Sequence, residues 1–203
     1  MRALIEKTAA YAVRRVSTCL RDDNRGAAAI EFAMILPIMF LLFVGTIEFG
    51  QALAVDRRVT LTASSSGDLI ARAKNGMITT TELDTELTIL RQLIRPYDES
   101  ALTVRVINVV AKRENGALRY IVNWSRDNYG GTPYPRNSNY PDMPANFVVE
   151  GESVIAAEAT YNYTPLIFNY FIKSAFDLQD RFFLRQREGG ICLRLDEAQC
   201  VNL

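Results

Sequence analysis

The chain has 203 residues, is 49% hydrophobic and carries 23 basic and 23 acidic side chains, so its formal net charge is zero. A neutral chain is not expected to bind nucleic acid by broad neutralisation of phosphates, and a chain without histidine cannot use Ser-His-Asp or Cys-His catalysis. A hydrophobic fraction of 49% also excludes a wholly disordered protein.

The most unusual segment, residues 26–50, reads GAAAIEFAMILPIMFLLFVGTIEFG. Residues 32–47 carry no charge and correspond to about 24 Å of helix. The flanking residues 27–30 and 51–55 extend this length enough to cross a hydrocarbon core of ~30 Å. No polar face is visible, unlike in the core helix of a soluble domain. We therefore expect a transmembrane helix at 27–55, surrounded by the lipid bilayer.

The charges around this segment predict its orientation. Six basic residues precede it, against three acidic ones: Arg2, Lys7, Arg14, Arg15, Arg21 and Arg25, with Glu6, Asp22 and Asp23. By the positive-inside rule this cluster stays in the cytoplasm, although Arg57 and Arg58 follow the segment. We expect a single-pass protein of the bacterial inner membrane, with its C-terminal domain in the periplasm.

A secretory signal peptide is one explanation of this N-terminus. Ala52-Leu53-Ala54 fits its cleavage site, and the chain would then be a secreted protein. However, such a segment is usually about 15–30 residues long, and this one would run to residue 54. It would also hold Glu31 and Glu48 in or beside its apolar region, where an ionised carboxylate is unfavourable.

A second explanation accounts for the glutamate. The stretch Arg25-Gly26-Ala27-Ala28-Ala29-Ile30-Glu31-Phe32 resembles a type IV prepilin processing site, and the run through residue 50 resembles the TadE/TadF group of pilin-like proteins. Those are minor pilins or pseudopilins of the tight-adherence (Flp, type IVc) pilus. The resemblance implies cleavage between Gly26 and Ala27, which removes a cytoplasmic leader, residues 1–26. It also implies that Glu31 and Phe32, fifth and sixth in the mature chain, serve in recognition and assembly.

The same resemblance implies the partners and the role of the chain. The partners are a prepilin peptidase, other pilin and pseudopilin subunits and the pilus assembly platform in the membrane. The role is pilus assembly and cell adhesion, from the membrane or within the pilus. The alternative is a secreted or single-pass membrane-anchored periplasmic binding protein unrelated to pili.

The two glutamates of the apolar segment need separate explanations. Cleavage after Gly26 would create an amine on Ala27, about 6 Å along the helix from Glu31, and a carboxylate at an apolar helix needs such a partner. Glu48 lies about 25 Å further on and about 100° around the helix, which excludes a carboxylate dyad. We expect Glu48 to be solvated at the outer interface, or else to contact a basic group of another pilin or of the assembly machinery.

The predicted fold class is α+β: a long N-terminal membrane-spanning helix followed by a small exported domain with an antiparallel sheet. The helix should continue as a stalk over 56–75 and end at Asn75-Gly76. In the domain, residues 76–203, Thr79 and Glu82 form a capping box for a helix that ends before Pro96. Strands are expected at 102–109, 118–124, 153–163 and 181–187, with a hairpin turn at 114–116.

Two segments of the domain lack a clear periodic pattern. Residues 126–146 hold four prolines, a Gly-Gly pair and three tyrosines. This composition is typical of a contact surface for partner subunits or a substrate, or of a surface excursion without a partner. Residues 166–172 are apolar but too short for a second span, so we expect them in the core or in a short interfacial helix.

The positions of the cysteines agree with export of the C-terminal domain. Cys192 and Cys200 are an even pair on the exported side, where disulfides persist, whereas Cys19 lies in the leader. Two thiolates without histidine are only half of a zinc site, and no phosphate-binding, dinucleotide-binding or hydrolase motif occurs. We therefore expect no enzymatic activity, no cofactor and no metal.

Overall fold

The computed structural model describes residues 25–114, 116–144, 147–167, 169, 175–187 and 192–200. Contacts divide the chain into two units, with the boundary between Ile47 and Glu48. Most of the expected leader, including Cys19, lies outside the described residues. Each unit is described by itself.

The first unit contains the first half of helix α2, which runs from Arg25 to Ala71 and includes Pro37. All side chains from Gly26 to Phe43 are exposed. Over residues 26–43 the apolar run therefore forms a helix that is exposed on every side, whereas Val44 is buried.

The second unit begins with the other half of α2, which is amphipathic. Val55, Val59, Ala63 and Ile70 are fully buried and recur at helical spacing on the face that packs on a sheet. Gly67 lies against the sheet: a Cβ added there would meet the Leu184 side chain, and the Ala157 Cβ at 3.1 Å. The segment 56–75, expected as a stalk, thus contributes to the core of the domain in this structure.

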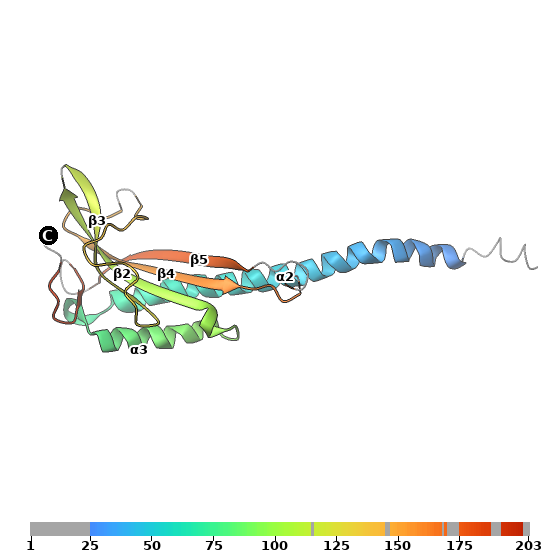
Figure 1. Ribbon diagram of the computed structural model, residues 1–203, viewed down its shortest axis with the longest axis horizontal. Coiled ribbons are helices and arrows are strands. Elements are labelled where there is room, and N and C mark those ends of the chain that lie inside the picture. The colour runs from blue at the N-terminus through green and yellow to red at the C-terminus, as the bar shows by residue number, and fades with distance from the viewer. Residues whose placement is uncertain are drawn as a thin grey trace, which may run out of the picture. The chain divides into compact units, whose positions relative to one another are not determined.

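A second helix, α3 (Thr80–Leu90), returns beside α2 after the short 3-10 turn η1 (Lys74–Gly76), in which Asn75 and Gly76 have positive φ (Figure 1). The capping box is confirmed: Thr79 Oγ1 accepts from Glu82 N at 3.2 Å, and Thr79 N donates to the Glu82 carboxylate at 3.0 Å. The chain then continues as the 3-10 turn η2 (Arg91–Ile94) rather than as α-helix.

The sheet is antiparallel in the order β3-β2-β4-β5. Its strands are β2 (Leu102–Glu114), preceded by the 3-10 turn η3 (Glu99–Ala101), β3 (Ala117–Asp127), β4 (Ser153–Tyr163) and β5 (Phe176–Arg185). The predicted range of β4 is confirmed, β2 and β3 are longer than predicted, and β5 begins five residues earlier and ends two earlier. A long apolar helix followed by this sheet confirms the α+β fold class.

Both faces of the sheet are covered. The face toward α2 and α3 carries residues such as Val104, Val106 and Ile155. The opposite face is covered by the chain between β3 and β4, where Tyr140 is 1% exposed. The segment 126–146 was expected as a surface feature, but the described part of it supplies a third layer of the domain.

One irregularity interrupts the pairing of β2 with β3. Asn108 pairs with Trp124 and Val109 pairs with Val122, so Asn123 is an extra residue, a β-bulge. A short parallel pair of β1 (Met77–Ile78) and β6 (Arg194–Leu195) then brings the C-terminal segment beside the start of α3.

Candidate functional site

The residues expected at the processing and assembly site lie in the first turns of α2. Gly26, Ala27 and Glu31 are exposed, and 58% of Phe32 is exposed. Positions four apart on a helix share a face, so Ala27 and Glu31 lie one turn apart on the same side. Among the described residues nothing covers the Gly26–Ala27 bond, and cleavage there stays a prediction.

The helix that follows is suited to an apolar environment. Side chains of every orientation are exposed, including Ile30 (62%), Phe40 (67%) and Phe43 (64%). Exposing them to water is unfavourable by about 25 cal/mol for each Å² of apolar surface. Among the described helices, α2 is long and apolar enough to cross a membrane. A helix that is hydrophobic all round needs a non-aqueous environment on all sides, and the hydrocarbon core of a bilayer supplies one.

Glu48 is not solvated, contrary to the expectation from its position after the apolar run. It is 7% exposed, and its carboxylate accepts hydrogen bonds from the backbone N–H of Leu166, at 3.1 Å, and of Ile167. Burial, followed by the charge of Glu48, raises the pKa of the nearby Tyr163 phenol. The carboxylate therefore has partners in its own chain, and a contact with another pilin stays a hypothesis.

Comparison with known proteins finds a family match in this part of the chain. Residues 26–67 match the TadE-like protein family. The match begins at Gly26, the residue expected before the cleaved bond, and ends at Gly67, where α2 packs on the sheet. It confirms the resemblance that the sequence indicates. The chain has no significant match among curated proteins or solved structures.

Beyond the TadE-like segment, a buried carboxylate attaches the third layer to the sheet. Glu158 on β4 accepts a hydrogen bond from the Tyr140 hydroxyl at 2.6 Å and lies 3.3–3.4 Å from the Tyr134 hydroxyl. Its negative charge is balanced by Arg181 at 3.2 Å and Arg105 at 3.8 Å. Burial, then the contact with Glu158, raises the pKa of the Tyr140 phenol, which therefore stays a hydrogen-bond donor.

An open recess of about 520 Å³ lies beside this cluster. Its lining is mainly polar and includes Arg105, Tyr134, Glu158, Thr160, Gln179 and Arg181. Both arginines are already paired with Glu158, and Arg181 also contacts Asp142 at 3.0 Å. The charges of the recess are thus matched within the chain, so we assign the cluster to the attachment of the third layer.

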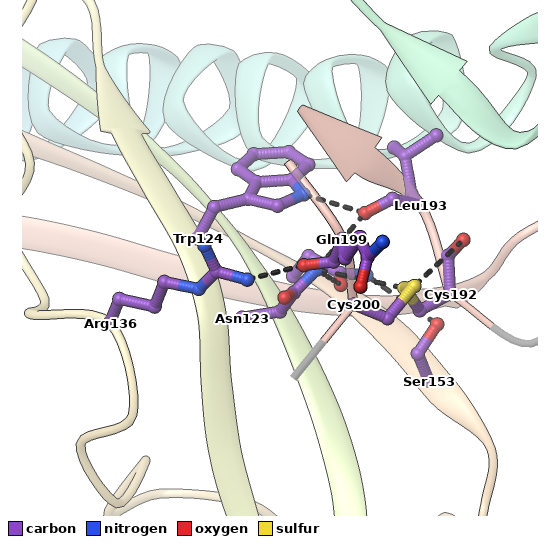
Figure 2. The surroundings of a disulfide bond; sticks show 9 residues. Asn123, Trp124, Arg136, Ser153, Cys192, Leu193, Gln199 and Cys200 are labelled. Atoms are coloured by element: carbon purple, nitrogen blue, oxygen red, sulfur yellow. Dashed lines mark hydrogen bonds between the residues drawn. A yellow bond between two sulfur atoms is a disulfide. The ribbon is translucent and has the colours of Figure 1, made fainter. Parts of the chain in front are cut away.

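The predicted disulfide joins Cys192 to Cys200. Trp124 Nε1 donates to the Leu193 carbonyl at 2.7 Å, and the Asn123 amide donates to the same oxygen at 3.2 Å. Figure 2 shows both side chains directed from β3 at the disulfide-bonded segment. The bulge at Asn123 thus gives the sheet a polar side chain that holds the C-terminal segment.

Two carboxylates of α3 have opposite electrostatic environments. Arg126 on β3 donates from Nε and Nη2 to the two oxygens of Asp84, both at 2.7 Å, and these hydrogen bonds lower the pKa of Asp84. Glu86 has a buried Oε2 with no hydrogen-bond partner among the described residues. Burial, followed by the charge of Glu82, raises the pKa of Glu86.

No group of three or more histidine, cysteine, aspartate or glutamate residues within the described ranges is arranged to hold a metal ion. Sequence reasoning identified the helix and the disulfide from local patterns. It missed the partners of Glu48 because Leu166 and Ile167 lie 118 and 119 residues away in the sequence.

Proposed function

We propose that this chain is a membrane-anchored minor pilin or pseudopilin that takes part in assembly of a tight-adherence (type IVc) pilus. The observation that carries the proposal is the order of features in α2. A glycine, a glutamate five residues later and an aromatic residue begin an apolar helix that is exposed on all sides over residues 26–43, and this segment matches the TadE-like family.

In this proposal a prepilin peptidase cleaves between Gly26 and Ala27 on the cytoplasmic side. The new amine of Ala27 then lies one helical turn from Glu31. An ionised carboxylate inside a membrane is unfavourable unless it gains a partner. The amine, of the same chain or of a neighbouring subunit, supplies that partner and fixes the register of the helices during assembly.

The proposed location is the inner membrane, with the N-terminus in the cytoplasm and the domain in the periplasm. The excess of basic residues before Gly26 supports this orientation. The disulfide between Cys192 and Cys200 also supports it, because disulfides persist in the oxidising periplasm. The partners are the peptidase, other pilin subunits, the membrane assembly platform and the bilayer.

The test is complementation of a strain that lacks this protein. Pili are counted by electron microscopy, and the amount of each variant in the membrane is measured by immunoblot. The wild-type chain should restore pili, and Glu31→Gln should be present in the membrane without restoring them. The matched control is Glu197→Gln, which neutralises an exposed carboxylate of the domain and should restore pili.

Two results would overturn the proposal. The pilus role fails if the deletion strain makes pili in normal number. The role of Glu31 fails if Glu31→Gln restores pili as well as the control does.

A further inference from the structure

The turn after β4 presents apolar side chains to solvent. Leu166 is 65% exposed, Ile167 is 38% exposed, and Phe176, at the start of β5, is 44% exposed. Neither Leu166 nor Ile167 is therefore a core residue. The remainder of the predicted segment 166–172, apart from Asn169, lies outside the described residues.

Hydrogen bonds connect this turn to Glu48 of α2. Both backbone N–H groups, of Leu166 and Ile167, donate to the carboxylate of Glu48. Phe176 belongs to the same end of the sheet, because its ring contacts the Tyr163 ring with centroids 5.3 Å apart. Phe49, the next residue of α2, is 66% exposed. We call Phe49, Leu166, Ile167 and Phe176 the apolar foot.

The position of Glu48 in the chain indicates what covers the foot. Residues 32–47 carry no charge, and Glu48 follows them directly. If those residues lie in hydrocarbon, as the proposed function requires, then Glu48 lies at the membrane boundary, and the turn bonded to it lies at the same level. Residues 49–55 and 159–165 are also uncharged. Asp177, which follows Phe176, is exposed and accepts a hydrogen bond from the Asn162 amide at 2.8 Å, so this charge has a partner within the chain.

The backbone chemistry of the turn also fits a lipid surface. An irregular turn ordinarily exposes N–H groups, and leaving such groups without partners in a poorly hydrated layer is unfavourable. Here the Glu48 carboxylate satisfies both N–H groups, and the same contact removes the carboxylate from solvent. Leu166 and Ile167 can therefore enter the interfacial layer with their exposed apolar side chains in contact with lipid and without unsatisfied backbone donors at these two positions.

We propose that the apolar foot inserts into the interfacial layer of the outer leaflet of the bilayer that α2 crosses. The partner is the lipid surface itself, and the inference rests on the membrane anchoring in the proposed function. Contact of the foot with lipid holds the domain at a fixed height on the membrane before the helix is extracted into a pilus.

The test uses tryptophan fluorescence of the full chain in vesicles of phosphatidylethanolamine and phosphatidylglycerol, with and without brominated acyl chains. The native chain contains one tryptophan, the buried Trp124, which gives a constant background. Leu166→Trp places the probe in the foot. Phe40→Trp places it in the apolar half of α2, and Ile89→Trp places it on the exposed face of α3, where 58% of Ile89 is exposed.

The added emission of Leu166→Trp should shift to shorter wavelength and lose intensity in brominated vesicles. Phe40→Trp should be quenched more strongly, and Ile89→Trp should not be quenched. Quenching of Phe40→Trp without quenching of Leu166→Trp would overturn the foot and leave the anchor intact. Absence of quenching at Phe40→Trp would overturn the anchor and the foot with it. Phe176→Trp repeats the measurement if the Leu166 variant does not fold.

Discussion

Replacing Tyr140 by phenylalanine tests whether the chain between β3 and β4 is part of the folded core. The substitution removes one oxygen and keeps the ring, which packs edge-on against Phe183. That oxygen donates to the buried Glu158 carboxylate at 2.6 Å, and a hydrogen bond to a charged acceptor contributes about 1.5–3 kcal/mol. We expect Tyr140→Phe to lower the free energy of unfolding by about this amount.

Tyr134→Phe is the matched control, because it removes a hydroxyl that faces the same carboxylate from 3.3–3.4 Å. A contact of this length is weak, so a loss of at most about 1 kcal/mol is expected. Unfolding by urea of the full chain in detergent, followed by the fluorescence of Trp124, measures both variants. The reasoning is refuted if Tyr140→Phe is within about 0.5 kcal/mol of the wild type, or if the control loses as much as Tyr140→Phe does.

Three further predictions concern the same domain and use the same urea assay. At neutral pH, Asp84→Asn should lower the free energy of unfolding by about 1 kcal/mol, because Arg126 lowers the pKa of Asp84 and stabilises its charged form. Glu86→Gln should raise the free energy of unfolding, because burial raises the pKa of Glu86 and its ionisation opposes folding. The Asp84 contribution is lost as pH falls through its lowered pKa, and the Glu86 penalty appears only as pH rises above its unfolded pKa. Both variants should therefore approach the wild type in acid, and a shift of the same sign for both at neutral pH would contradict the assignment. Cys200→Ser should lower the free energy of unfolding by about 2–3 kcal/mol, and a reductant should destabilise the wild type but not this variant. A wild-type protein whose stability does not change with reductant would contradict the disulfide. Gly67→Val should lower the free energy of unfolding by about 1–3 kcal/mol, because the valine side chain would meet the sheet. Gly50→Val, with open space around it, should change the free energy of unfolding by less than about 0.5 kcal/mol. Equal losses in the two variants would argue against close packing at Gly67.

Elements with local signals could be predicted from the sequence. The capping box of Thr79 and Glu82 depends on residues three apart, and β4 is a mainly apolar run between turn residues. The first half of β5, Phe176–Asp180, was not predicted as strand. It lies in an edge strand with many polar, exposed side chains, so alternation of apolar and polar residues is weak there.

The sequence indicates that the second face of the sheet is covered, but it does not indicate which segment of the chain covers it. Residues 106–111 of β2 and 153–159 of β4 are mostly apolar at consecutive positions, apart from Asn108, Ser153 and Glu158, and such runs are typical of strands covered on both faces. In the structure both runs are buried without a break. This pattern indicates that something must cover the second face. Only the tertiary structure shows that Tyr140 and its neighbours do so.

The N-terminal residue of the mature protein, isolated from its native source, tests the proposed function most directly. Processing by a prepilin peptidase predicts Ala27, with Glu31 as the fifth residue. An N-terminus at Met1 would mean an uncleaved anchor, and one at Val55 would mean a secretory signal peptide. Either result would contradict the prepilin processing on which the proposed role in pilus assembly depends.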